Sequence, residues 1–172
     1  LYQENYVMET TQLGEKISPE QSGDEHGSAV AMSTDGNVIA TGAWYNDGTD
    51  STGTITDSGH VRIFKFNNNT WTQMGSDIDG AAAYDYTGTA ISLSSNGKRV
   101  AIGSAWHNGG YGHVRIYEFN DDGNTWTQMG SDIDGTNNQF GYSVSLSGDG
   151  ETIAIGERYY SNVSSYEGAV SV

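Results

Sequence analysis

The stretch TWTQMGSDIDG occurs twice in the chain without a single substitution, at 70–80 and again at 125–135. The flanking sequence repeats too, with more divergence: 27–47, 88–108 and 141–161 match one another, and 59–66 matches 112–119 and, weakly, 168–172. The segment 10–17 is a degenerate copy of the opening stretch. Repeats of this kind indicate stacked supersecondary units, none of which buries its apolar face alone. We therefore expect a tandem array, with repeats at about 1–62, 63–115 and 116–172.

Each repeat alternates apolar and small or polar residues with the period of a β-strand, and helical spacing occurs nowhere. In 90–94 the apolar side chains of Ile91 and Leu93 share one face. An Asn96-Gly97 pair follows, which favours a tight hairpin turn, and Asp35-Gly36 and Asp149-Gly150 occupy the same place in the other copies. The pattern predicts strands near 27–33, 37–42, 59–66, 71–75, 88–94, 98–103, 112–119, 125–130, 141–147 and 151–156.

The same alternation predicts which side chains form the core. We expect most of it from Val30, Met32, Val38, Ile39, Val61, Ile63, Ile91, Leu93, Val100, Ile102, Val114, Ile116, Val144, Leu146, Ile153 and Ile155.

Four short antiparallel strands per repeat, with no helix longer than one turn, are typical of a β-propeller blade. The expected fold is thus all-β, a β-propeller-type array of four-stranded antiparallel blades. A β-sandwich is the main rival, but a sandwich does not require near-identical units in tandem. Three blades are fewer than the four to eight of a closed ring, so we expect a segment of a larger propeller, or copies that complete one another by self-association.

Composition narrows the class. The chain has 24 glycines, one proline and no cysteine, and its 22 acidic and seven basic residues give a net charge of −15. Phosphate backbones would be repelled, which excludes nucleic-acid binding. The chain contains no run of 18 apolar residues, so we expect no membrane insertion. The acidity fits a soluble extracellular protein or a cation binder, and Asn68 and Asn162 begin glycosylation sequons.

The residues Phe140-Gly141, followed after a hairpin by Ile155-Gly156-Glu157-Arg158, resemble the FG-GAP repeat, the blade unit of integrin α-subunit propellers. The chain departs from the motif elsewhere, because the Phe position holds His26 and Thr87 in the other copies. The resemblance implies an extracellular or cell-surface protein that acts in recognition or adhesion. It also implies a calcium loop between the first two strands of a blade.

The hairpins at 33–36, 94–97 and 147–150 carry too few carboxylates for calcium, which takes six to eight oxygen ligands, so we interpret them as turns. Better calcium candidates are the aspartates of the repeated stretch, which otherwise would cap backbone amides in turns. They are Asp77, Asp79, Asp132 and Asp134.

No catalytic motif is present, and we expect no enzyme. The strand histidines His60 and His113 occupy equivalent positions next to an arginine, which favours a duplicated structural pair over a catalytic base. Carboxylate pairs such as Asp77 and Asp79 would suit a glycosidase, but acidic pairs are too common in this chain to be informative.

In a propeller, the loops between second and third strands lie on the same face as the connections between blades. Aromatic rings next to amides suit sugars or a protein partner, although the same rings would also fill the contact between two blades. The candidate ligand-binding residues in these loops are Trp44, Tyr45, Asn46, Trp106, His107, Asn108, Tyr159 and Tyr160.

Two functions remain open. The first is a non-catalytic extracellular recognition or adhesion module that binds glycan or protein through loops on one propeller face. The second is a structural building block of an extracellular filament, coat or surface assembly. Exposed, ligand-binding aromatic loops would favour the first function, and burial of the same loops against a neighbouring chain would favour the second.

Overall fold

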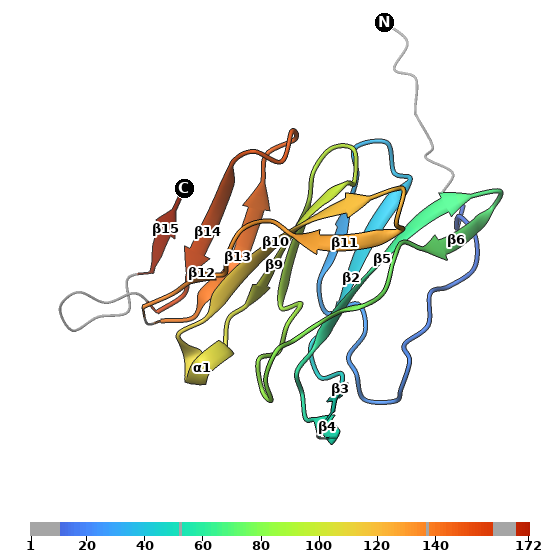
Figure 1. The fold of residues 1–172 in the computed structure, drawn as a ribbon. Coiled ribbons are helices and arrows are strands. Elements are labelled where there is room, and N and C mark those ends of the chain that lie inside the picture. The colour runs from blue at the N-terminus through green and yellow to red at the C-terminus, as the bar shows by residue number, and fades with distance from the viewer. Residues whose placement is uncertain (1–10, 52, 137, 160–167) are drawn as a thin grey trace, which may run out of the picture.

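The computed structural model describes residues 11–51, 53–136, 138–159 and 168–172, and the chain is all-β (Figure 1). Three antiparallel sheets stand side by side in chain order, each twisted against the next. The predicted all-β array is confirmed. Within the described ranges, no helix has the length and apolar character needed to cross a membrane.

The first two sheets have the same topology. In the first, the strand order is β1 (Val30–Met32), β2 (Val38–Ala43), β5 (His60–Asn67) and β6 (Thr70–Gln73), and β7 (Ile78–Asp79) pairs with β5. In the second, it is β8 (Ala90–Leu93), β9 (Arg99–Ser104), β10 (His113–Asn120) and β11 (Thr125–Gln128), and β12 (Ile133–Asp134) pairs with β10.

The third sheet contains β13 (Phe140–Leu146), β14 (Ile153–Glu157) and β15 (Ala169–Ser171). A small hairpin of β3 (Gly48–Asp50) and β4 (Gly53–Ile55) projects from the first sheet, and a one-turn helix, α1 (His107–Gly110), precedes β10. The degenerate copy of the repeated stretch, at 10–17, forms no strand in its described part, 11–17.

The prediction of four strands per blade needs one correction. The SDIDG segments are not only connections, because Ile78 and Asp79 pair back onto the start of β5, and Ile133 and Asp134 do the same on β10. The pairs Asp79-Gly80 and Asp134-Gly135 are typical of turns, so the sequence suggested a loop at each place. Two residues are too short a strand for alternation to reveal it.

Glycines of neighbouring repeats meet where one sheet packs against the next: Gly42 meets Gly88, and Gly103 meets Gly141. A Cβ atom on Gly42 would lie 2.3 Å from the carbonyl oxygen of Gly88 in the next sheet, and one on Gly103 would lie 2.1 Å from that of Gly141. Only glycine allows this backbone approach. The glycine near the end of the second strand of one sheet, Gly42 or Gly103, therefore packs against the glycine that precedes or begins the first strand of the next sheet, Gly88 or Gly141.

Serine side chains organise the predicted hairpin turns. Ser33 donates to Asp35 at 2.6 Å, and Ser147 donates to Asp149 at the same distance, while Ser94 donates to Asn96 at 2.8 Å. Hydrogen bonds from Ser33, and then from Asn37, lower the pKa of Asp35 to about 2. These carboxylates serve the turns, as the sequence predicted.

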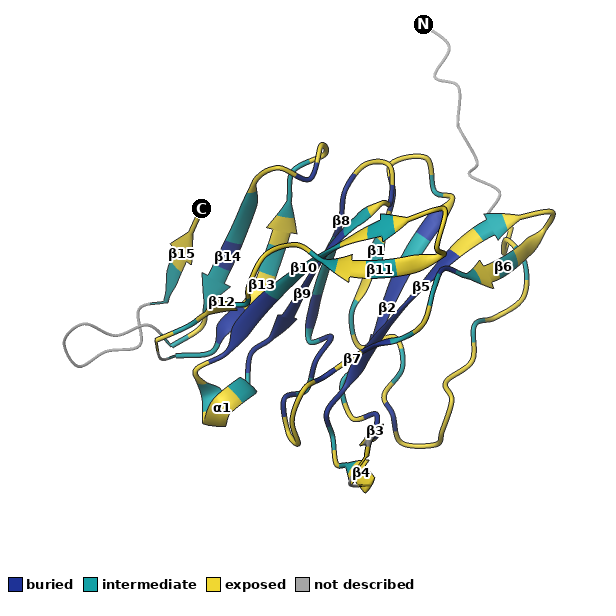
Figure 2. Ribbon diagram, viewed as in Figure 1, coloured by how far each residue is buried: buried dark blue, intermediate teal, exposed yellow. Residues whose placement is uncertain are grey.

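The main core lies between the first and second sheets, whose inner strands β2 and β9 are mostly buried in Figure 2. It contains Val38, Ala40, Val61, Ile63, Met74, Ile78, Leu93, Val100 and Ile102, and a second cluster joins Val114, Phe140 and Ile155. The predicted Ile39, Ile91, Ile116, Val144, Leu146 and Ile153 are only half-buried.

Two predicted core residues are wrong. Val30 and Met32 of β1 are 69% and 64% exposed, whereas Leu93, which corresponds to Met32 in the second repeat, is buried. Leu93 belongs to the same buried cluster as Val38 and Ile63 of the preceding sheet. In the described part of the chain no sheet precedes β1, so its outward face has no such partner.

Candidate functional site

The predicted aromatic loops come together at one end of the sheets. Trp44 follows β2 and Trp106 follows β9, and their ring centroids are 5.9 Å apart in an edge-to-face arrangement. Tyr86, from the connection between β7 and β8, contacts both tryptophans, at 6.4 and 5.7 Å. Loops between second and third strands and the connection between blades therefore lie on the same face.

The ring contacts extend beyond these three residues. Tyr45 lies 5.4 Å from Tyr86, and Trp106 lies 6.2 Å from Tyr142 of the third sheet. Tyr45, Tyr84 and Tyr142 are each exposed. We call Trp44, Tyr45, Tyr84, Tyr86, Trp106 and Tyr142 the aromatic row; it joins all three sheets.

The tryptophans are half-buried, so each packs within the row and stays partly accessible to solvent. The indole Nε1 of Trp44 donates to Glu25 at 2.7 Å. A hollow of about 470 Å³ adjoins Trp106 and Tyr86 and is lined by residues 82–86 and 106–109. Asn108, one of the predicted ligand contacts, is exposed in this hollow with φ of 51°.

Other predicted contacts are placed less favourably. Asn46 is buried, and its amide donates to Asp24 at 3.3 Å, so this side chain is engaged inside the protein. Tyr159 is half-buried under the guanidinium of Arg158, which lies 4.8 Å from its ring and 4.7 Å from that of Tyr142. Tyr160 lies outside the described residues. The binding role of all these residues stays a prediction.

Sequence reasoning missed Tyr84, Tyr86 and Tyr142. Their signal was present, because Tyr-Asp-Tyr at 84–86 and Gly-Tyr at 141–142 flank the repeated first strands. These residues do not align between repeats, and a search for matched loop positions passes over them.

The aspartates of the repeated stretch lie beside basic groups. Asp132 accepts hydrogen bonds from Gln128 at 2.7 Å and from Arg115 at 3.1 Å; burial raises its pKa, but these bonds outweigh burial and lower it. Asp77 accepts from Gln73 at 2.5 Å, and burial followed by the charge of Asp77 raises the pKa of Asp79. A calcium site at Asp77, Asp79, Asp132 and Asp134 stays a prediction.

Two buried histidines begin the third strands. His60 pairs with Asp79 across β5 and β7, and His113 pairs with Asp134 across β10 and β12. Burial, followed by the neighbouring Arg115, lowers the pKa of His113 to about 4, and burial also lowers the pKa of His60. Both rings are therefore neutral at pH 7.

His107 is held by a carboxylate. Its Nδ1 lies 2.9 Å from Oδ1 of Asp85, a buried residue whose other oxygen accepts the Ala82 amide at 3.0 Å. The His107 ring stacks on His113, with centroids 4.0 Å apart. Asn68, the described sequon residue, is exposed in the turn between β5 and β6, and Asn162 lies outside the described residues.

No family model matches the chain, and no curated protein does. The FG-GAP resemblance therefore stays a prediction. Solved structures of similar fold include a putative 6-phosphogluconolactonase of Bacteroides fragilis, with a TM-score of 0.48 and 14% identity over 82% of this chain and 36% of that one. The periplasmic gluconolactonase of Pseudomonas aeruginosa gives 0.44 and 15% over 77% and 36%. Hydrazine synthase of Kuenenia stuttgartiensis gives 0.45 and 12% over 83% and 44%.

The chain thus spans less than half the length of each of these three structures. Likeness at this level concerns the fold and says nothing about substrate. From its own sequence and sheet topology, the chain is an all-β repeat array with sheets of about four antiparallel strands.

Proposed function

We propose that the chain is a non-catalytic recognition module, extracellular or at the cell surface, that binds a neutral glycan through the aromatic row. The observation that supports this proposal is the continuous set of ring contacts from Tyr45 to Tyr142, with exposed tyrosines along it. Tyrosine and tryptophan offer apolar ring area to a sugar, and their polar atoms add directional hydrogen bonds.

Charge supports a neutral ligand. The chain carries a net charge of −15, and Glu25, Asp47 and Asp57 lie near the row. Desolvation followed by the charge of Asp57 raises the pKa of Tyr86. An anionic sugar would meet repulsion at this surface, whereas hydroxyl groups of a neutral sugar could donate to the carboxylates.

The test is a printed glycan array, followed by calorimetry with the oligosaccharide that binds best. We expect Tyr45→Ala and Tyr142→Ala each to weaken binding about tenfold, or roughly 1.4 kcal/mol. Tyr111→Ala is the control, because Tyr111 is exposed but belongs to none of the ring contacts of the row. Unchanged affinity in both row variants would contradict the proposal, as would protein ligands binding where no glycan does.

A second candidate function is a structural unit of an extracellular assembly. It is favoured by Met129 and Ile133, which are exposed although the same residues of the first copy are buried. Sedimentation distinguishes the two: reversible self-association that Met129→Glu abolishes would support assembly. A monomer that binds glycan would support recognition instead.

A further inference from the structure

The two strand histidines carry polar atoms that nothing described in the protein satisfies. His60 and His113 are 1% and 0% exposed, and neither ring nitrogen of either residue has a hydrogen-bond partner among the described residues. The nearest carboxylate oxygens to their Nδ1 atoms are those of Asp77, at 3.7 Å, and Asp132, at 3.6 Å, both too far for a hydrogen bond. Such buried orphan atoms destabilise the folded chain and call for a physical reason.

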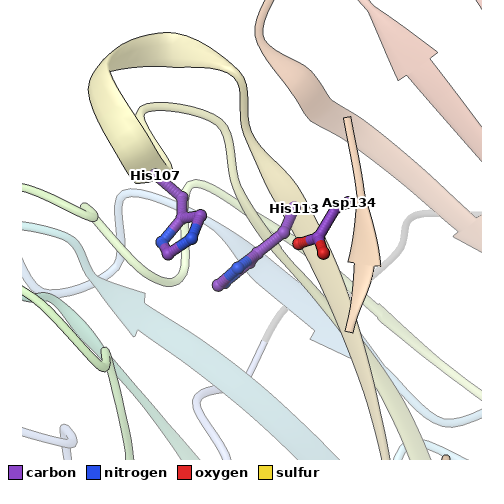
Figure 3. A group of neighbouring side chains, drawn as sticks. All are labelled: His107, His113 and Asp134. Atoms are coloured by element: carbon purple, nitrogen blue, oxygen red, sulfur yellow. The ribbon is translucent and has the colours of Figure 1, made fainter. Parts of the chain in front are cut away.

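In the second blade a further histidine stands beside the orphan ring. Figure 3 shows His107, from α1, next to His113, from the start of β10, with the Asp134 carboxylate of β12 close by. One ligand atom from each of these three residues lies within 4.8 Å of the other two.

Asp85 prepares His107 as a ligand. When Nδ1 of His107 donates to the buried Asp85 carboxylate at 2.9 Å, the lone pair of the neutral ring is on Nε2. A carboxylate behind a histidine is the arrangement that fixes tautomer and ring orientation in metal sites.

We propose that His107, His113 and Asp134 bind a divalent transition-metal ion of the Zn²⁺ class, with Asp85 as a positioning residue. Two imidazole nitrogens and one carboxylate oxygen are a donor set that zinc accepts, and water completes four-coordination. Tetrahedral bonds of about 2.0–2.2 Å place ligand atoms about 3.3 Å apart, and each Zn–N bond lies in the plane of its ring. Binding therefore draws the three side chains together and turns the His113 ring out of its stack on His107. Calcium, which takes oxygen ligands, does not fit this set.

The first blade offers an internal comparison. Asn46 stands where the second repeat has His107, since Asn46 contacts Asp24 as His107 contacts Asp85. The ligand atoms nearest to Nδ1 of His60 are therefore the carboxylate oxygens of Asp77 and Glu20, at 3.7 and 3.8 Å. The guanidinium of Arg62 lies 3.7 Å from the same Glu20 carboxylate, which disfavours a cation there. His60 and His113 hold equivalent positions, but only His113 has a second imidazole, that of His107, within reach of the same ion.

The experiment titrates the 172-residue chain with Zn²⁺ by calorimetry and with Co²⁺ by visible absorption. We expect one equivalent to bind with micromolar affinity and the absorption bands of tetrahedral Co²⁺ to appear. His113→Ala and His107→Ala should weaken Zn²⁺ binding at least 100-fold, and Asp85→Asn 10–100-fold. His60→Ala, the matched control, should bind as the unchanged chain does.

Circular dichroism of each variant shows whether it folds. His107 is half-buried in a short loop helix, so His107→Ala decides the matter even where His113→Ala does not fold. Failure of the unchanged chain to bind Zn²⁺ at millimolar concentration would overturn the proposal. So would full affinity in folded His107→Ala, or competition by Ca²⁺ at equal concentration.

Discussion

The two copies of TWTQMGSDIDG have one sequence and two environments. In the first copy Met74 and Ile78 are 7% and 6% exposed, whereas Met129 and Ile133 in the second are 37% and 36% exposed. The difference arises from the following sheet: Trp126 lies over the first copy, and its Nε1 donates to the carbonyl oxygen of Met74 at 2.7 Å. Burial in this array is thus conferred by the next repeat and not by the copy itself.

The same contact occurs once more at the beginning of the described chain. Nε1 of Trp71 donates to the carbonyl oxygen of Leu13 at 2.9 Å, as Trp126 does to Met74. Leu13 lies in the degenerate copy of the repeated stretch, at 10–17. Each of the two Trp-Thr-Gln strands, at 71–73 and 126–128, therefore packs on the preceding copy of the repeated stretch.

The largest expected effect compares Leu93 with Met32, which hold the same position in successive repeats. Leu93→Ala should reduce the free energy of unfolding by about 2–5 kcal/mol, because it removes side-chain contacts between the first two sheets. Met32→Ala should change it by less than about 0.5 kcal/mol, because Met32 is exposed. Urea unfolding measures both. Equal losses would show that neighbouring sheets do not determine burial.

The next effect concerns the glycine contacts between sheets. Gly42→Ala and Gly103→Ala should each cost about 1–3 kcal/mol, since the new methyl group meets backbone of the next sheet. Gly123→Ala is the control, because its Cβ would meet only the side chain of Thr125, at 3.2 Å. Thermal unfolding of the three variants checks this, and a silent Gly103→Ala would rule out the close approach.

A smaller effect is the pH dependence of stability that His26 gives to the first blade. His26 occupies the position of Thr87 and Phe140, and burial, followed by Arg62, lowers its pKa to about 4 from 6.5. Because the unfolded chain binds this proton first, the stability that His26 contributes is present above pH 6.5 and lost as the pH falls towards 4. His26→Gln should remove on the order of 1 kcal/mol of that loss. Urea midpoints at pH 7 and pH 4.5 give the comparison; an unaltered pH dependence would contradict it.

Local sequence predicted the strands and turns well, because alternation and Asp-Gly or Asn-Gly pairs report directly on strands and hairpins. It could not predict that Val30 and Met32 are exposed, since their pattern matches that of Ile91 and Leu93 and only the neighbouring sheet differs.

The candidate site was predicted in part. Matched loops indicated Trp44, Trp106 and His107, and the structure brings the two tryptophans into contact. Tyr86 and Tyr142 were missed, because each occurs in one repeat alone and reaches the others only through the packing of the sheets. Asp85 was missed although Asp24 holds the same position in the first repeat, because the contact of each aspartate with its loop residue is made only in the folded chain.

The most direct test of burial by the next repeat is the oxidation of Met74 and Met129 by hydrogen peroxide, followed by peptide mass spectrometry. Both methionines have the same neighbours in sequence, from Thr-Trp-Thr-Gln to Gly-Ser-Asp, so in urea their oxidation rates should be equal. In the folded protein we expect Met129 to be oxidised several-fold faster than Met74, in keeping with their exposure. Equal rates in the folded protein would contradict the account.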